Sequence, residues 1–308
     1  MTTGTDPLAP LAELPGVPEA VAEVRKAVDR LYGHRVMRRR APEVTSEAAL
    51  RGARASAALD GADWPLEEVR RRSDFGADAE ARTVGGALRI SAEAGQLLSI
   101  WRHSPLQVLA RLHLLAVGDA DDSAGRPRRQ GEEVAELFPL ELKAAQGVGP
   151  EVQGVGLETS APAEPSATPA GLPAAPSADE VAARLDQLSQ LLVARAEGTA
   201  SGTPALVVAA VVHGELLALR PFASHNGVIA RAAQRIVLIA EGLDPKAICP
   251  AEVGFAELGT AAYRTALQAY LGGTADGMAA WIAHCGQALR LGVRESTAVC
   301  EAMQRGMV

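Results

Sequence analysis

The stretch that decides the fold is Arg220-Pro-Phe-Ala-Ser-His-Asn-Gly-Val-Ile-Ala-Arg231, a short loop between two apolar runs. Asparagine and glycine directly before a helix can present backbone N–H groups and the positive end of the helix dipole to an anion. Arg231 would lie one turn inside that helix. The junction can therefore bind phosphate. Because Asn-Gly before a helix is often only a turn and an N-cap, that simpler interpretation also stays open.

Helix boundaries recur on both sides of this loop. Upstream, Thr203-Pro204 begins a helix that reaches Arg220, and the capping box Ser177-x-x-Glu180 begins the helix before it. Downstream, Asn226 opens a helix that ends at Gly242. Two more helices are expected to follow, at Ala251–Leu271 and Ala275–Leu291.

The N-terminal part shows apolar residues at the helical spacing of three and four. Helices are predicted over 17–31, 45–59 and 105–117, and the last two stop at Asp60-Gly61 and Gly118. A further helix is indicated at Gly131–Ala145, kinked or broken by Pro139. Strand-like alternation is nearly absent, so the sequence predicts an all-α fold.

Composition narrows the classes of protein. The 308 residues, 48% of them apolar, can bury a full core. A net charge of −7 and a pI near 5.5 provide no basic field for nucleic acid. The longest apolar stretch without a charged residue, Gly198–Gly214, is shorter than the ~20 residues that a helix needs to cross a bilayer. Three cysteines without a CxxC pair indicate a reducing compartment. With an N-terminus unlike a signal peptide, we expect a soluble, cytoplasmic protein that binds neither nucleic acid nor membrane.

Residues 147–176 differ from the rest of the chain. They are rich in glycine and proline and contain almost no large apolar side chain. Such a segment cannot bury enough surface to become part of a core, so we expect a flexible insert.

The loop resembles the signature of the Fic family, His-x-Phe-x-Asp/Glu-Gly-Asn-Gly-Arg-x-x-Arg. The positions that agree in register are Pro221, Phe222, Asn226, Gly227 and Arg231. Other segments are similar to the family in the same order along residues 45–290. They are Ser56–Gly61, which resembles the inhibitory helix motif Ser/Thr-x-x-x-Glu-Gly/Asn, Gly125–Arg128, His213, and the closing helices with Tyr263 and Trp281.

The resemblance implies a helical bundle with a flexible Gly/Pro-rich insert. In these terms the expected regions are an N-terminal helical extension (1–44), helices with the candidate inhibitory motif (45–103), a Fic-like core with the insert 147–176 (104–245), and C-terminal helices (246–308).

The family transfers AMP from ATP to protein hydroxyls, and the resemblance implies a role for each loop position. Arg220 stands where the family has its catalytic histidine, and a guanidinium cannot accept a proton at neutral pH. Ser224 replaces the acidic ligand of Mg²⁺. His225 replaces the first glycine, and Val228 replaces an arginine. Ordinary AMP transfer is therefore not expected.

Anion binding could survive these replacements. We expect Arg220, Ser224, His225, Asn226, Gly227 and Arg231 to surround the phosphate position, with Arg220 and Arg231 both facing it. The main hypothesis is a degenerate Fic-family protein with a regulatory role that binds a nucleotide such as ATP, another phosphorylated ligand, or a protein partner, with weak or no dependence on Mg²⁺.

Two alternatives stay open. The first is an AMP transferase with rewired chemistry in which His225 acts as the base. The second is a structural interaction module without a ligand.

Three further residues belong to the candidate inhibitory motif: Ser56, Asp60 and Gly61. The Asp60 carboxylate is expected to point at Arg231. Because aspartate is one methylene shorter than the glutamate of the family motif, we expect the pair to be loose or bridged by water. A plain helix stop at Asp60-Gly61 explains the same residues.

The remaining histidines favour no metal site. His213 lies in an apolar helix and is interpreted as a packing residue with a hydrogen-bond partner. His103 and His113 have no neighbour at ligand spacing, and His284 has only Cys285 beside it.

Overall fold

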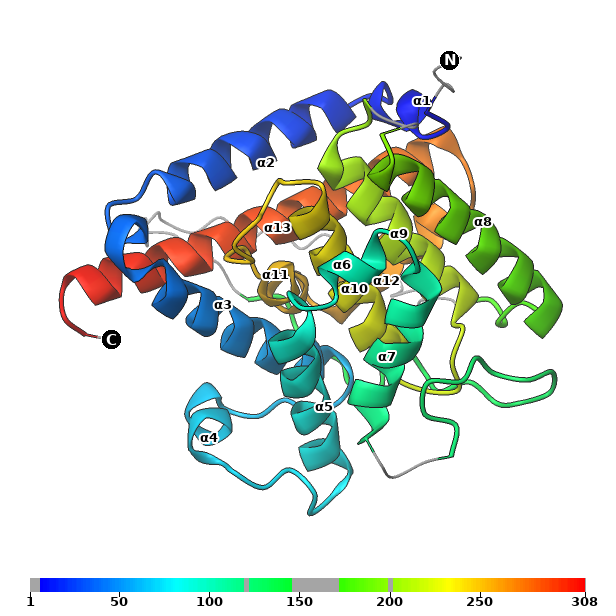
Figure 1. The fold of residues 1–308 in the computed structure, drawn as a ribbon, viewed down its shortest axis with the longest axis horizontal. Helices are drawn as coiled ribbons and strands as arrows, with labels where there is room; N and C mark the ends of the chain where they lie inside the picture. Colours follow the sequence, from blue (N-terminus) through cyan, green and yellow to red (C-terminus); the bar gives the residue numbers. More distant parts are fainter. Residues whose placement is uncertain (1–5, 119–121, 146–171, 199–201, 308) are drawn as a thin grey trace, which may run out of the picture.

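The computed structural model describes residues 6–118, 122–145, 172–198 and 202–307 (Figure 1). These residues form thirteen α-helices and no strand, which confirms the all-α prediction. The helices are α1 (Ala9–Ala12), α2 (Val17–Tyr32), α3 (Met37–Leu59), α4 (Leu66–Arg71), α5 (Ala79–Glu93), α6 (Leu98–Trp101), α7 (Pro105–Val117), α8 (Ala178–Ala196), α9 (Ala205–Leu219), α10 (Asn226–Ala240), α11 (Ala251–Leu258), α12 (Thr260–Leu271) and α13 (Ala275–Gln304).

The centre of the bundle is the helix pair α9 and α10 (Figure 1). Helix α9 is apolar on almost every side, and nearly all of its residues are buried. A helix that is apolar all round has to be enclosed by other elements. Helices α10, α12, α13 and α2 supply that enclosure, while α10 also contacts α3, α5, α6 and α7. The loop that joins α9 to α10 is thus fixed at both ends in the core.

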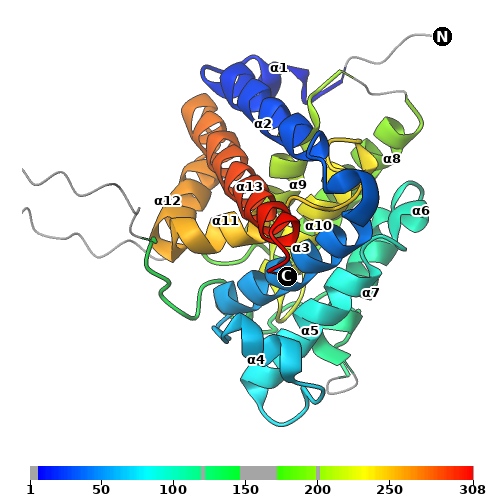
Figure 2. The ribbon, with the colours of Figure 1, turned by 90° about the vertical axis from the view of Figure 1, so that its left-hand side faces the viewer.

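Two groups of helices flank this pair. On one side α13 runs along α2, and the two lie next to each other in both views (Figure 1 and Figure 2). On the other side α3 packs on α5, and α5 on α7. Helix α3 also contacts α10, α11 and α13, so its C-terminal end reaches the start of α10. This placement brings residues of the candidate inhibitory motif to the loop.

Several predicted boundaries are confirmed by the helix ends. Ser177 caps α8 by accepting a hydrogen bond from the backbone N–H of Glu180. Helices α7, α9 and α10 begin and end within two residues of the predicted positions. In each case the signal was local, either a cap residue or a proline in the first turn.

Other boundaries were predicted wrongly. The predicted helix at Gly131–Ala145 is absent, because Pro139 interrupts it and the segment bonds to other parts of the chain, including Ala223 and Thr260. The expected helix at Ala251–Leu271 is two helices, since Gly259, with a φ of 83°, breaks it. Helix α3 begins before Thr45, at Met37, and is kinked at Arg40, while α13 continues past Leu291 to Gln304. Helices α1, α4, α5 and α6 were not predicted.

Most of the Gly/Pro-rich insert, residues 147–171, lies outside the described residues. Its end, residues 172–176, lies close to the central loop, and backbone carbonyls of Pro173 and Pro176 accept hydrogen bonds from two arginines. Among the helices of the described part of the chain, none is long and apolar enough to cross a membrane.

An aromatic cluster closes the core behind α10. His213 is fully buried on α9, and its Nε2 lies 2.5 Å from the hydroxyl of Tyr263. The rings of Phe255 and Trp281 lie 5.1 and 5.2 Å from the His213 ring. Burial, and then the charge of Arg231, lower the pKa of His213 well below its ordinary value. His213 is therefore a neutral packing residue with a hydrogen-bond partner, as predicted.

A pH dependence of stability follows from His284, whose ring lies beside this cluster. Burial lowers the pKa of His284 from 6.5 to about 4. Between pH 6.5 and pH 4 the unfolded chain binds a proton at His284 that the folded chain does not bind. The free energy of unfolding therefore decreases as the pH is lowered, by about 1.4 kcal/mol per pH unit. We expect the free energy of unfolding, measured with urea between pH 4.5 and 6.5, to depend less steeply on pH in His284→Gln than in the wild type. The difference in slope should correspond to about one proton.

The matched control for this measurement is His103→Gln, because His103 is exposed. It should leave the slope of the wild type unchanged. Equal slopes for His284→Gln and the wild type would contradict the assignment.

Candidate functional site

The loop between α9 and α10 has a left-handed backbone at both ends. Arg220 has a φ of 44° and His225 a φ of 59°, values that cost free energy for residues other than glycine. At the start of α10, His225 thus adopts a conformation that a glycine would adopt without strain. Contacts on either side of the loop compensate this backbone strain.

One of these contacts is made by Asn226. Its Oδ1 accepts a hydrogen bond from Phe222 N at 3.0 Å, and its Nδ2 donates to Phe222 O at 2.7 Å. The Phe222 ring stacks on buried His113 at 4.2 Å. Asn226 was predicted to bind phosphate, but its side chain is used within the loop, where it determines the turn into α10.

A second set of contacts comes from the segment after α7. Arg128 N donates to Pro221 O and Ala135 N donates to Ala223 O, each at 2.8 Å. The loop carbonyls therefore point toward this segment. The N–H of Val228, at the start of α10, points instead toward Asp60 at the end of α3.

The carboxylate of Asp60 lies at the N-terminus of α10. Its Oδ2 accepts a hydrogen bond from the backbone N–H of Val228 at 3.2 Å, and its Oδ1 accepts one from Arg231 Nη2. A Cβ at Gly227 would lie only 2.5 Å from Asp60 Oδ1. Only glycine leaves room for the carboxylate at this position. An anion thus occupies the backbone cradle that the sequence predicted, and that anion belongs to the chain itself.

Arg231 is buried, with 1% of its surface exposed. Its Nε donates to Ser56 Oγ at 2.9 Å and its Nη2 donates to Ser56 O at 3.0 Å, in addition to the ion pair with Asp60. The expected contact between Asp60 and Arg231 is present. The expectation of a loose or water-bridged pair was wrong, because Ser56 holds α3 close enough for the shorter aspartate to reach. Gly61, with a φ of 102°, lies directly after α3 and Asp60.

Comparisons with solved structures agree with this architecture. The chain is similar to a Fic family protein from Desulfovibrio desulfuricans G20, with 23% identity and a TM-score of 0.64 over 92% of this chain and 75% of that one. It is also similar to Fic-1 from C. elegans, with 15% identity and a TM-score of 0.59 over 93% of this chain and 73% of that one. A Fic domain-containing signaling protein from Bacteroides thetaiotaomicron is similar as well, with 11% identity and a TM-score of 0.57 over 92% of this chain and 97% of that one. The chain has the Fic fold. No family model and no curated protein matches the sequence.

Arg220, which the motif resemblance places at the family's base position, is not brought to Arg231 by the structure. Arg220 Nη2 donates to Pro173 O at 2.6 Å, whereas the hydrogen bonds of Arg231 go to Ser56 and Asp60. The expectation that both guanidinium groups face one phosphate position is therefore not met. The left-handed backbone of Arg220 directs its side chain toward the end of the insert.

The family implies Mg²⁺ held by an acidic residue, and the residues present do not fit that ion. Ser224 stands at the position, and its hydroxyl hydrogen-bonds to His225 Nδ1 at 2.8 Å. A neutral hydroxyl is a poor ligand for a hard dication. Across the described part of the chain, no group of three or more His, Cys, Asp and Glu side chains could hold a metal ion.

Some functional contacts were missed by sequence reasoning. The backbone N–H of Val228 binds the Asp60 carboxylate, although the valine was read only as the loss of an arginine. From the sequence, Arg128 was named only as part of the segment Gly125–Arg128. Its contact with the Arg220 carbonyl was not predicted. A loop that matches a phosphate-binding signature could have suggested the backbone donor, because such sites use N–H groups irrespective of side chain.

The ion pair of Asp60 with Arg231 should contribute strongly to stability. Asp60→Ala leaves a guanidinium unpaired in a buried site, which should lower the free energy of unfolding by about 3 kcal/mol in urea denaturation. The matched control is Asp63→Ala, which breaks the more exposed pair with Arg54 and should cost less than about 1 kcal/mol. Equal losses in the two variants would show that Asp60 acts only as part of a helix stop.

Proposed function

We propose that this chain is a degenerate member of the Fic family that binds a nucleotide, or another phosphorylated ligand, at the N-terminus of α10. In this proposal it acts by regulation and does not transfer AMP. Asp60 holds the site closed, and the ligand gains access when the end of α3 withdraws.

One observation carries the proposal: the Asp60 carboxylate sits on the Val228 N–H, against Gly227, and pairs with Arg231. These donors are a backbone N–H at a helix N-terminus and a guanidinium, which are groups that bind phosphate in proteins. A terminal phosphate and the carboxylate would compete for the same atoms. The contact therefore supports an anion site that is inhibited from within the chain.

The side chains of the loop argue against AMP transfer. Burial, and then the charge of Arg128, lower the pKa of Arg220, yet a guanidinium remains a poor proton acceptor at neutral pH. Ser224 offers no charge to a metal, and Val228 contributes only its backbone N–H. The skeleton for binding phosphate remains, whereas the groups for proton transfer and metal binding do not.

Calorimetric titration of wild type, Asp60→Ala and Asp63→Ala with ATP, ADP and GTP tests the proposal. Asp60→Ala should raise the affinity by about tenfold or more, because Arg231 and the Val228 N–H are freed, while Asp63→Ala should match the wild type. Affinity should be nearly the same with and without Mg²⁺. A strong Mg²⁺ requirement, or identical affinities for all three proteins, would contradict the proposal.

A second candidate is favoured by the hydrogen bond between His225 Nδ1 and Ser224 Oγ, since it places an imidazole at the start of α10. In that case His225 would serve as the base of a rewired transferase.

Incubation with radioactive ATP distinguishes the two candidates. We expect no labelling of the protein or of a lysate, for the wild type or for Asp60→Ala. Labelling that disappears in His225→Ala but persists in the control His103→Ala would establish the second candidate and defeat the first.

A further inference from the structure

A separate pocket lies on the other side of the loop. It has a volume of about 480 Å³ and is enclosed by the segment 128–134, the end of the insert and the start of α8. Its polar lining consists of Arg128, Gln130, Glu132, Ser177 and Arg220. The acidic residues in the first turn of α8, Asp179 and Glu180, do not line it.

Two guanidinium groups share this pocket. Arg128 is 8% exposed, and it donates from Nε to Arg220 O at 2.9 Å and from Nη2 to Pro176 O. Arg220 donates from Nη2 to Pro173 O at 2.6 Å. All three acceptors are neutral backbone carbonyls. The hydrogen bonds fix the positions of the two guanidinium groups but do not neutralise their charges.

Among the described residues, no carboxylate pairs with either of these two charges. Neither Arg128 nor Arg220 forms an ion pair within the described ranges. Glu132 lines the pocket, but its carboxylate accepts from Arg126 Nη2 at 2.8 Å and from Arg129 N at 2.7 Å. The charge of Arg128 adds to burial in lowering the pKa of Arg220, as expected for two cations close together.

Donors remain available as well as charge. Arg220 Nε is buried without a hydrogen-bond partner among the described residues. Arg220 Nη1 and Arg128 Nη1 likewise form no hydrogen bond there. The pocket therefore offers the two Nη1 groups and two positive charges to one anion, while Arg220 Nε is buried behind them.

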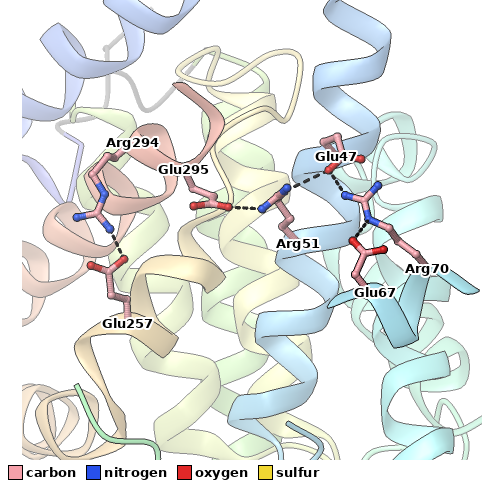
Figure 3. Close-up of polar contacts among 7 residues, drawn as sticks. All are labelled: Glu47, Arg51, Glu67, Arg70, Glu257, Arg294 and Glu295. Atoms are coloured by element: carbon pink, nitrogen blue, oxygen red, sulfur yellow. Dashed lines mark hydrogen bonds and ion pairs between the residues drawn. The ribbon is translucent and has the colours of Figure 1, made fainter. Parts of the chain in front are cut away.

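Another pocket of the molecule shows the opposite arrangement. It has a volume of about 630 Å³ and lies between α3, α11 and the start of the segment 140–145. There Arg51 lies between Glu47 and Glu295, and Arg54 pairs with Asp63 (Figure 3 shows the first of these networks). Every arginine that lines this larger pocket is matched by a carboxylate. Arg51 and Arg54 in the larger pocket are thus paired with carboxylates, whereas Arg128 and Arg220 form hydrogen bonds only to backbone carbonyls among the described residues.

We propose that the pocket of Arg128 and Arg220 binds a phosphate monoester, at a site distinct from Asp60 and Arg231. A monoester dianion brings two charges, which match the two cations, and three terminal oxygens that can accept from the Nη1 groups of both arginines. A carboxylate brings one charge and two oxygens and would leave part of the site unmatched. The hydroxyl of Ser177, which lines the same pocket, can add a further hydrogen bond.

Arg220 lies at the left-handed C-cap of α9, with a φ of 44°, and its side chain lines this pocket. The proposal concerns different side chains from those of the nucleotide site, so either site can exist without the other.

Calorimetric titration of the full chain with O-phosphoserine, and with a short peptide that carries one phosphoserine, tests the pocket. Arg220→Asn removes the guanidinium, and asparagine tolerates a left-handed backbone better than most residues. We expect saturable binding to the wild type that weakens at least tenfold in Arg220→Asn. The matched control is Arg51→Asn, which removes a paired arginine of the larger pocket and should bind like the wild type.

The outcomes decide the proposal and identify the source of the phosphate. Binding of the free amino acid and the peptide alike indicates a small phosphate ester, and preference for the peptide indicates a phosphorylated protein segment. No saturable binding to the wild type, or equal weakening in Arg51→Asn, overturns the proposal. If phosphoserine affinity rises in Asp60→Ala together with that for ATP, the phosphate binds at Arg231. The pocket proposal would then fail while the proposed function stands.

Discussion

Arg231 carries a positive charge into an apolar helix bundle, and the structure around the loop depends on how that charge is compensated. Desolvating a guanidinium costs several kcal/mol unless a partner and hydrogen bonds replace the lost water. Ser56 supplies two acceptors and Asp60 supplies the negative charge. All of them come from the last turn of α3. The position of α3 against α10 is therefore coupled to the charge of a single buried side chain.

Under the proposed function, this coupling would keep an anion site closed from within the chain. The backbone groups of that site are Gly227, the N–H of Val228 and the left-handed turn at His225. These groups depend on chain geometry and tolerate changes of side chain. Proton transfer and metal binding depend instead on the chemistry of particular side chains, and the proposal assigns those positions to Arg220 and Ser224. In this proposal, binding and catalysis can be lost separately, because they rely on different parts of the chain.

Much of the fold was predictable from local signals, whereas the finer geometry was not. Caps such as Ser177 and prolines in first turns act over a few residues, so α7, α8, α9 and α10 could be placed from the sequence. Helix α5 was missed although Asp78 caps its start, because its burial depends on contacts with α3 and α7.

The candidate site shows the same division. The contact of Asp60 with Arg231 could be predicted from motif positions, but its tightness depends on Ser56, and the direction of Arg220 depends on a backbone angle. Such features arise from packing between segments far apart in the sequence, which spacing along the chain does not encode. The roles of these residues in ligand binding stay predictions.

In the proposed function, the N-terminus of α10 is an anion site for which Asp60 competes. The ¹⁵N–¹H resonance of the Val228 amide, followed by nuclear magnetic resonance while Asp60→Ala is titrated with ATP, reports on this site. We expect a large, saturating shift of this amide, with a much weaker response in the wild type at the same ATP concentration. If the Val228 amide stays unchanged while ATP binds, the nucleotide lies elsewhere and the proposed function is wrong.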